Sequence, residues 1–126
     1  MSKGNIIGLS HIGIFVKNID VSIDFYKRLG FSLDNEESPH VRLAFMSAGT
    51  CLIELIEQKD NQRSAGVVDH VAMEVDDVEA AVARANANGI NIDASKIASV
   101  PIMGGIRHVF FAGPDDERLE FFENSK

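Results

Sequence analysis

Two histidines and two glutamates in this chain have the types and surroundings of metal ligands. His11 and His70 each lie in a short segment rich in Ile, Val and Phe, and Glu54 and Glu120 each lie in a later apolar segment. A carboxylate among apolar side chains is costly unless it is paired or bound to a metal. Mixed nitrogen and oxygen ligands suit Zn, Ni, Co, Mn or Fe, and the sequence does not choose among these ions. The four residues predict a site for one divalent metal.

The four candidate ligands occupy matching places in an internal repeat. Segment 10–16 aligns with 69–75, and segments 41–45 and 52–57 align with 106–110 and 118–123. A single histidine or glutamate on a strand is more often a core or surface residue than a ligand. Recurrence of both types favours a site, although duplication alone could keep them by inheritance. A repeat of this length indicates a duplicated supersecondary unit.

Each copy of the repeat predicts one β-α-β-β-β module. The patterning predicts strands at 9–16, 31–36, 41–47, 51–57, 69–75, 90–94, 106–111 and 118–123. The first helix is predicted to begin with Asp20 as its cap and to end at Gly30. The second is predicted to begin at Asp76, which forms a capping box with Glu79, and to end at Gly89. We expect an α+β fold in which two tandem modules form curved mixed sheets around a metal-binding cleft.

The two modules are expected to form a single domain over residues 1–126. Module one covers about 6–57, a polar linker covers 58–67, and module two covers about 68–124. A chain of 126 residues suits one compact domain.

Side-chain alternation along segment 51–57 places Glu54 on one face of the predicted strand and some of its neighbours on the other. Glu54 shares a strand face with Leu52 and Ile56, whereas Glu57 and Cys51 fall on the opposite face. We therefore expect Cys51 to be a small packed residue rather than a nucleophile.

Composition narrows the class of partner. The formal net charge is −7, which disfavours nucleic acid because its phosphates would be repelled. No apolar run approaches the roughly 20 residues that span a bilayer, and we expect no membrane partner. The single cysteine cannot form an internal disulfide, which fits a reducing, cytoplasmic setting.

Several longer motifs resemble the vicinal oxygen chelate superfamily, which includes glyoxalase I, extradiol dioxygenases and bleomycin-resistance proteins. The motifs span 11–20, 25–31, 52–57, 69–77 and 113–121, which covers nearly the whole chain. The resemblance is closest to glyoxalase I-like members, whose metal has two His and two Glu ligands. By matching position it implies His11, Glu54, His70 and Glu120. One departure is the turn at 114–116, which reads Pro-Asp-Asp where Pro-Asp-Gly is common in the family.

This resemblance implies a glyoxalase-type lyase or isomerase that removes a proton next to a carbonyl and stabilises the resulting enediolate with its metal. Glu120 is expected to be the catalytic base, with Glu54 second. The expected partners are a small α-oxo or thiol-adduct substrate and a second copy of the chain. Two alternatives are a drug- or metabolite-binding protein without turnover and an acyl-CoA 2-epimerase.

Three further side chains remain candidates for substrate contact. Arg42 and Arg107 recur at matching repeat positions and could hold a carboxylate, or could be solvated strand charges. His108 could face the cleft. The pairing of modules, within one chain or between two chains, is left open by the linker.

Overall fold

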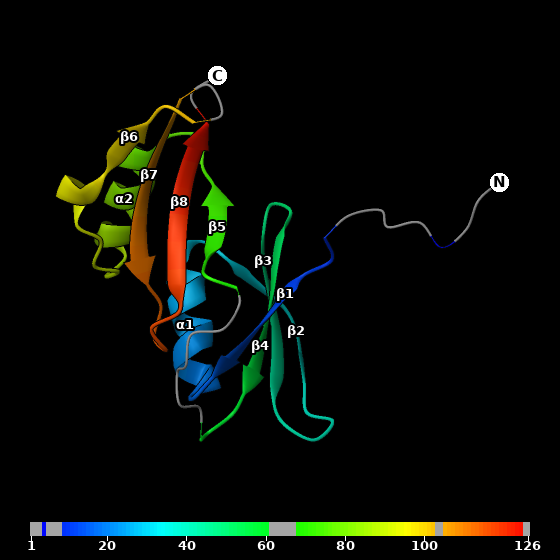
Figure 1. Cartoon of the computed structure of the whole chain (residues 1–126). Helices are drawn as coiled ribbons and strands as arrows, with labels where there is room; N and C mark the ends of the chain where they lie inside the picture. The colour runs from blue at the N-terminus through cyan, green and yellow to red at the C-terminus, as the bar shows by residue number, and fades with distance from the viewer. Residues whose placement is uncertain (1–3, 5–8, 61–67, 103–104, 125–126) are drawn as a thin grey trace.

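The structure is a computed structural model that describes residues 4, 9–60, 68–102 and 105–124. The chain forms two four-stranded mixed sheets, each built from the strands of one half of the sequence (Figure 1). This arrangement confirms the predicted α+β fold of two β-α-β-β-β modules. Most of the predicted linker lies outside the described residues.

The first sheet, which we call sheet one, has the strand order β1-β4-β3-β2. Strand β1 runs parallel to β4, and the other neighbours are antiparallel. The elements of module one are β1 (Ile12–Val16), α1 (Ile19–Leu29), β2 (Ser32–Glu37), β3 (Leu43–Ala48) and β4 (Cys51–Glu57).

Sheet two repeats this order as β5-β8-β7-β6, with β5 parallel to β8. The elements of module two are β5 (Val71–Glu74), α2 (Val78–Ala87), a 3₁₀ turn η1 (Ala94–Lys96), β6 (Ala98–Val100), β7 (Ile106–Ala112) and β8 (Arg118–Asn124). His11 and His70 immediately precede β1 and β5, so both strands begin later than the sequence predicts.

The strand predicted at 90–94 is wrong. The side chain of Asn86 accepts a hydrogen bond from the Ile92 backbone N–H and donates one to the Ile92 carbonyl. These two bonds satisfy the backbone locally, in place of a sheet ladder. Asp93 then caps η1 through the N–H of Ser95, and the short β6 follows.

Both helices have side-chain caps at their N-termini, but not the ones predicted. Asn18 accepts a hydrogen bond from the N–H of Val21 in α1, and Asp77 accepts one from the N–H of Ala80 in α2. The predicted capping residues Asp20 and Asp76 are thus each displaced from the true cap by one or two positions. Gly30 ends α1 in the left-handed conformation, with φ of 119°, as predicted.

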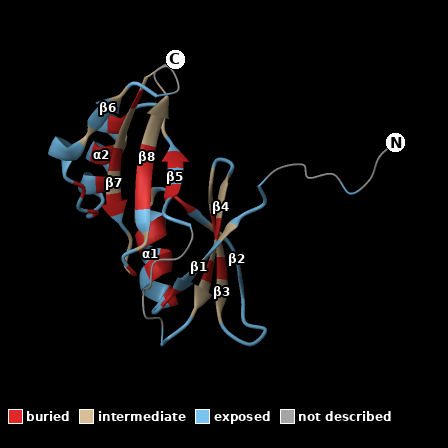
Figure 2. Ribbon diagram, viewed as in Figure 1, coloured by how far each residue is buried: buried red, intermediate tan, exposed pale blue. Residues whose placement is uncertain are grey.

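Each helix covers one face of its own sheet. Helix α1 packs on β2, β3 and β4, and α2 packs on β7 and β8. Figure 2 shows buried residues along both helices and on the strands that face them. The buried residues of the two modules form one cluster.

Helix α1 also binds the β7–β8 turn of module two. The Tyr26 hydroxyl donates a hydrogen bond of 2.7 Å to the carboxylate of Glu117. Just before the helix, the Lys17 N–H donates to Asp115 in the same turn. Because α1 contacts both modules, the helix-covered sides of the two sheets lie toward the same core.

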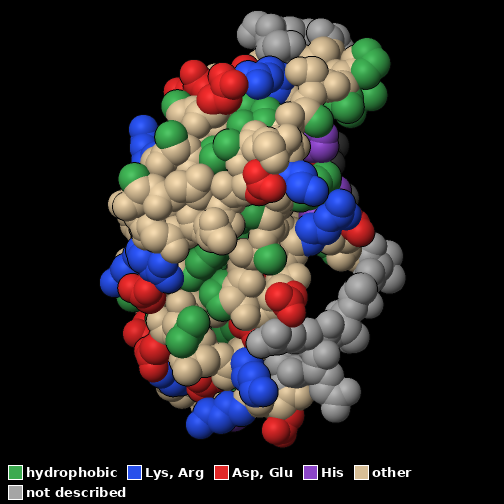
Figure 3. Space-filling view, turned by 90° about the vertical axis from the view of Figure 1, so that its left-hand side faces the viewer, with side chains coloured by type: hydrophobic (Ala, Val, Ile, Leu, Met, Phe, Trp, Pro, Cys, Tyr) green, Lys and Arg blue, Asp and Glu red, His purple; other side chains and the backbone are tan. Residues whose placement is uncertain are grey.

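The outer surface over α2 and β6 carries charged side chains of both signs, interspersed (Figure 3). Histidine side chains appear at the edge of this view. Among the residues that the structure describes, no helix is long and apolar enough to cross a membrane.

Candidate metal centre

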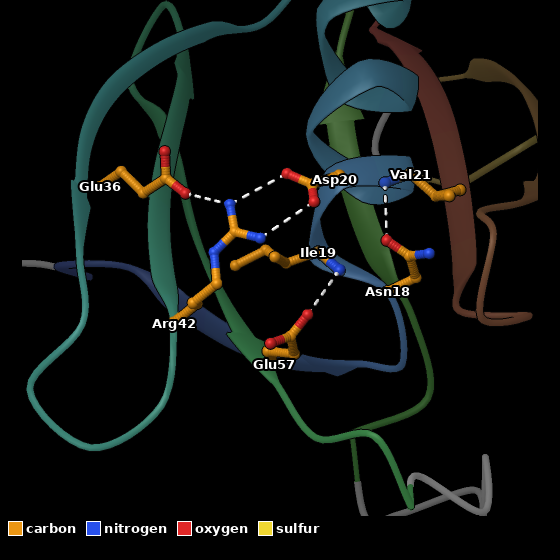
Figure 4. Close-up of polar contacts among 7 residues, drawn as sticks. All are labelled: Asn18, Ile19, Asp20, Val21, Glu36, Arg42 and Glu57. Atoms are coloured by element: carbon orange, nitrogen blue, oxygen red, sulfur yellow. Dashed lines mark hydrogen bonds and ion pairs between the residues drawn. The ribbon is translucent and has the colours of Figure 1, made fainter.

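The closing strand of each module carries two glutamates that face opposite sides of the sheet. Glu57 lies on the helix side, where it accepts a hydrogen bond from the N–H of Ile19 at the start of α1 (Figure 4). Glu123 does the same for Val78 at the start of α2. A carboxylate at a helix N-terminus satisfies free N–H groups and opposes the helix dipole. Alternation then places Glu54 and Glu120 on the other face, which we call the ligand face of each sheet.

The two repeated arginines also lie on the helix side. Arg42 makes two hydrogen bonds of 2.9 Å with Asp20, in the first turn of α1, and pairs with Glu36 (Figure 4). The hydrogen bond from Arg42 lowers the pKa of Asp20. Arg107 donates one hydrogen bond of 3.2 Å to Glu79 in the first turn of α2. The suggestion that these arginines hold a substrate carboxylate is therefore wrong. Each forms an ion pair with an acidic side chain in the first turn of a helix.

The first predicted His–Glu pair meets on the ligand face of sheet one. The Nε2 atom of His11 lies 3.3 Å from Oε1 of Glu54, and the Glu54 side chain is 19% exposed. Phe45, directly opposite Glu54 on β3, places its ring edge-on to the imidazole of His11, with centroids 5.8 Å apart. The aromatic ring restricts where the imidazole can turn.

The second pair repeats this geometry on sheet two. The Nε2 atom of His70 lies 3.2 Å from Oε1 of Glu120, whose side chain is only 7% exposed. Phe110 lies opposite Glu120 on β7, and its ring is edge-on to His70 at 5.3 Å. Each module thus contributes the same His–Glu–Phe arrangement.

The separations within both pairs fit two neighbouring ligands of one ion. Donor atoms about 2.1 Å from an ion and at right angles are about 3.0 Å apart, and they are farther apart at wider angles. The structure does not bring all four residues together within the chain. Across the described residues, no three His, Cys, Asp or Glu side chains are grouped so that they could hold one metal ion.

A third histidine lies beside the second pair. The buried Nδ1 atom of His108 is 2.8 Å from Oε2 of Glu120, although it is not aligned for a hydrogen bond. His108 pairs with Phe122 in the β7–β8 register, which puts it on the ligand face. Leu43 occupies the matching place in module one. This placement agrees with the expectation that His108 could face the cleft, and alternation from Phe110, two residues away on the same strand, gives the same face.

The residue before each histidine binds the remaining ring nitrogen. Ser10 Oγ lies 2.8 Å from Nδ1 of His11, and Asp69 Oδ2 lies 2.7 Å from Nδ1 of His70. Arg118 donates a hydrogen bond of 2.6 Å to the same Asp69 oxygen. The His70 hydrogen bond, followed by the charge of Arg118, lowers the pKa of Asp69. Sequence reasoning missed both residues, though their place next to the histidines was a signal.

The ligand faces are the less covered sides of the sheets. On β1, Val16 is fully buried on the helix side whereas Phe15 is 55% exposed. Half-buried apolar side chains continue this face around Glu54: Leu43, Phe45, Leu52 and Ile56. A sheet face of this kind is available for a substrate or for another protein surface.

Cys51 falls on the strand face opposite Glu54, as predicted. It is half-buried against the core, and burial raises the pKa of its thiol. It lines a cavity of about 770 Å³ between the start of β1 and strand β5. A raised pKa disfavours the reactive thiolate, which agrees with a packing role.

The sequence matches the glyoxalase/bleomycin resistance protein/dioxygenase superfamily over residues 8–121. The chain therefore belongs to this superfamily. Its members bind small molecules, generally use a divalent metal ion and commonly form dimers.

Individual relatives agree with this assignment. The chain is 32% identical over 123 residues to the uncharacterized protein YwbC of Bacillus subtilis (strain 168), covering 91% of this chain and 96% of that one. It resembles a crystal structure of a glyoxalase family protein from Enterococcus faecalis, with a TM-score of 0.77, 22% identity and coverage of 93% and 98%. The fosfomycin resistance protein FosX of Listeria monocytogenes gives a TM-score of 0.73 at 19% identity, covering 96% of each chain. The two structures support the fold alone.

Proposed function

We propose that the protein is a metal-dependent lyase or isomerase of the glyoxalase I type, which moves a proton next to a carbonyl group of a small α-oxo or thiol-adduct substrate. The observation that carries this proposal is the repeated His–Glu pair, with Nε2–Oε1 separations of 3.3 and 3.2 Å on the open face of each sheet. The ligands would be His11, Glu54, His70 and Glu120. Superfamily membership supports the metal but does not choose the reaction.

The four ligands would come together between two chains. Within one chain the helix-covered sides of both sheets lie toward the shared core, so the ligand faces are turned away from it. A second copy could set its module two against module one of the first chain. Each dimer would then hold two equivalent sites, which follows the usual closed symmetry of homodimers.

Glu120 is the proposed base. On a thiol adduct that carries a hydroxyl on the carbon next to the carbonyl, its carboxylate takes the proton from that carbon, and the electron pair left behind moves to the carbonyl oxygen to give an enediolate. The hydroxyl proton passes to the former carbonyl oxygen as the hydroxyl-bearing carbon becomes the new carbonyl, and the same carboxylate returns its proton to the former carbonyl carbon. A divalent ion held by the four residues would supply positive charge where negative charge develops on the substrate oxygens. Glu120 is more buried than Glu54, with side chains 7% and 19% exposed, so its carboxylate is held more closely in place.

The first test is metal content. Protein purified without chelator should contain about one divalent transition metal per chain, and His11→Ala and His70→Ala should each lose it. Full metal content in both variants would contradict the site.

The second test is proton exchange in deuterated solvent, with methylglyoxal plus several thiols and then with other α-oxo and acyl-thioester compounds. Glu120→Gln keeps an oxygen ligand but is a much weaker base, so it should retain metal and lose rate by about 100-fold or more. Glu54→Gln is the matched control and should lose less. If the metal-loaded wild type exchanges no proton while binding an apolar compound tightly, the alternative of a binding protein is correct.

A further inference from the structure

The two proposed histidine ligands have different partners for their second ring nitrogen. Asp69 is adjacent to His70 in the sequence, and Ser10 is adjacent to His11. Their oxygens lie 2.7 and 2.8 Å from the respective Nδ1 atoms. In both rings the Nε2 atom is the one that faces the glutamate. Both modules therefore have a side-chain contact to Nδ1 of the histidine, but a hydroxyl makes it in module one and a carboxylate makes it in module two.

A carboxylate and a hydroxyl constrain a histidine differently. An ionised carboxylate only accepts hydrogen bonds, so Asp69 requires that Nδ1 of His70 carry the hydrogen. Nε2 is then left to present its lone pair to a metal. A hydroxyl both donates and accepts, so Ser10 is compatible with either neutral tautomer of His11.

In module two, the carboxylate of Asp69 is itself held in place by a neighbouring side chain. Arg118 donates to Asp69 at 2.6 Å and places its guanidinium over the ring of Phe110, 3.9 Å from the centroid. Phe110 in turn contacts the His70 ring. The corresponding position in module one is Leu52, which can neither donate a hydrogen bond nor stack in this way. Arg118, Asp69, His70 and Phe110 thus form a closed set of contacts around one imidazole.

We propose that Asp69 is a positioning residue that holds His70 preformed as a metal ligand, whereas Ser10 only orients His11. This inference rests on the proposed function. It predicts that the module-two pair provides most of the metal affinity. An outer hydrogen bond to a ligand histidine changes metal affinity by about 10–100-fold in other proteins.

The test compares Asp69→Ala with Ser10→Ala in the full-length protein. Zinc affinity, measured by competition with a coloured chelator, should fall about 10–100-fold for Asp69→Ala and by less than about 10-fold for Ser10→Ala. Two exchange variants sharpen the comparison: Asp69→Ser should weaken zinc binding, and Ser10→Asp should strengthen it. Equal losses in the two alanine variants, or no response to either exchange, would overturn the proposal.

A second readout does not depend on metal binding. Ring nitrogen NMR of metal-free protein, at a pH where the ring is neutral, should show the hydrogen of His70 on Nδ1 and lose this preference in Asp69→Ala. A hydrogen on Nε2 in the wild type would overturn the positioning role. If wild type shows the expected tautomer but binds no metal, the proposed function fails while the contact to Asp69 stands. Circular dichroism checks that each variant is folded.

Discussion

Tyr26 is the residue whose burial has the clearest consequence for stability. Its side chain is fully buried, and its hydroxyl donates to Glu117 in the other module. Burial, and then the negative charge of Glu117, raise the pKa of Tyr26 well above its ordinary value. The folded state therefore keeps the neutral phenol at a pH where the unfolded chain ionises it, and folding stability must fall as the pH rises above about 10.

Replacing this tyrosine should remove both the hydrogen bond to Glu117 and the part of the alkaline sensitivity that the phenol causes. Tyr26→Phe should lower the free energy of unfolding at pH 7 by about 1–3 kcal/mol, as expected for a buried hydrogen bond to a charged group. The difference from wild type should narrow as the pH rises above about 10, because only the wild type carries the titrating phenol. Urea unfolding at a series of pH values measures this difference.

The chain offers an internal control for this prediction. Tyr26 is the only tyrosine and there is no tryptophan, so tyrosinate absorbance reports this residue alone. In folded protein the absorbance should appear at higher pH than in the urea-unfolded chain. Titration at the same pH in both states would show that the phenol is not protected.

Among the elements, the β7–β8 turn carries backbone strain that one substitution should relieve. Asp116 has φ of 61°, the only positive φ at a described non-glycine residue. Glycine adopts this conformation without the steric cost that a side chain incurs. Asp116→Gly should therefore raise the free energy of unfolding by about 0.5–1 kcal/mol, since the relieved strain exceeds the extra chain entropy of glycine.

The β3–β4 turn of module one provides the reverse substitution. Gly49 has φ of 59°, and an added Cβ there would meet no atom within 4 Å. Gly49→Asp should therefore destabilise the protein through backbone conformation alone. Thermal unfolding of both variants tests the pair, and a stabilising Gly49→Asp or a destabilising Asp116→Gly would contradict the argument.

Hydrophobic alternation and the repeat were sufficient to predict most elements of the fold. They failed where a polar side chain bound the backbone groups that a strand would have used. Ile90 and Ile92 are buried as in a strand, but Asn86 takes both hydrogen-bonding groups of Ile92 and prevents a ladder. A single sequence does not show which nearby asparagine will bind the backbone. For the same reason the predicted caps of both helices were wrong: several nearby Asn and Asp side chains could have capped each helix, and the sequence does not show which one does.

The predicted site residues were found as pairs because a pair depends only on one sheet. Strand alternation and register bring Glu54 to His11 and Glu120 to His70. Whether the pairs face each other depends on how whole modules pack, and that is decided by contacts such as Tyr26 with Glu117. These contacts join positions far apart in the sequence. Hydrophobic periodicity is a local pattern, so it cannot predict them.

At the level of the whole molecule, the proposed site requires a dimer, and two inactive variants should together restore it. In a dimer of one His11→Ala chain with one His70→Ala chain, module one of the second chain keeps His11 and module two of the first keeps His70. If each site joins module one of one chain to module two of the other, one of the two sites is intact and the other has lost both histidines. Differently tagged chains, co-expressed and purified through both tags, should bind about one metal per dimer.

The same experiment distinguishes exchange between chains from pairing within one chain. If each chain built its own site, every site in the mixed dimer would lack one histidine, and the metal content should stay as low as in the parent variants. The double variant His11→Ala/His70→Ala, paired with wild type, is the control: exchange predicts two damaged sites in that dimer, whereas pairing within one chain leaves one site intact. Sedimentation that finds only monomer at micromolar concentration would exclude the shared site, because each chain turns its two ligand faces away from their common core.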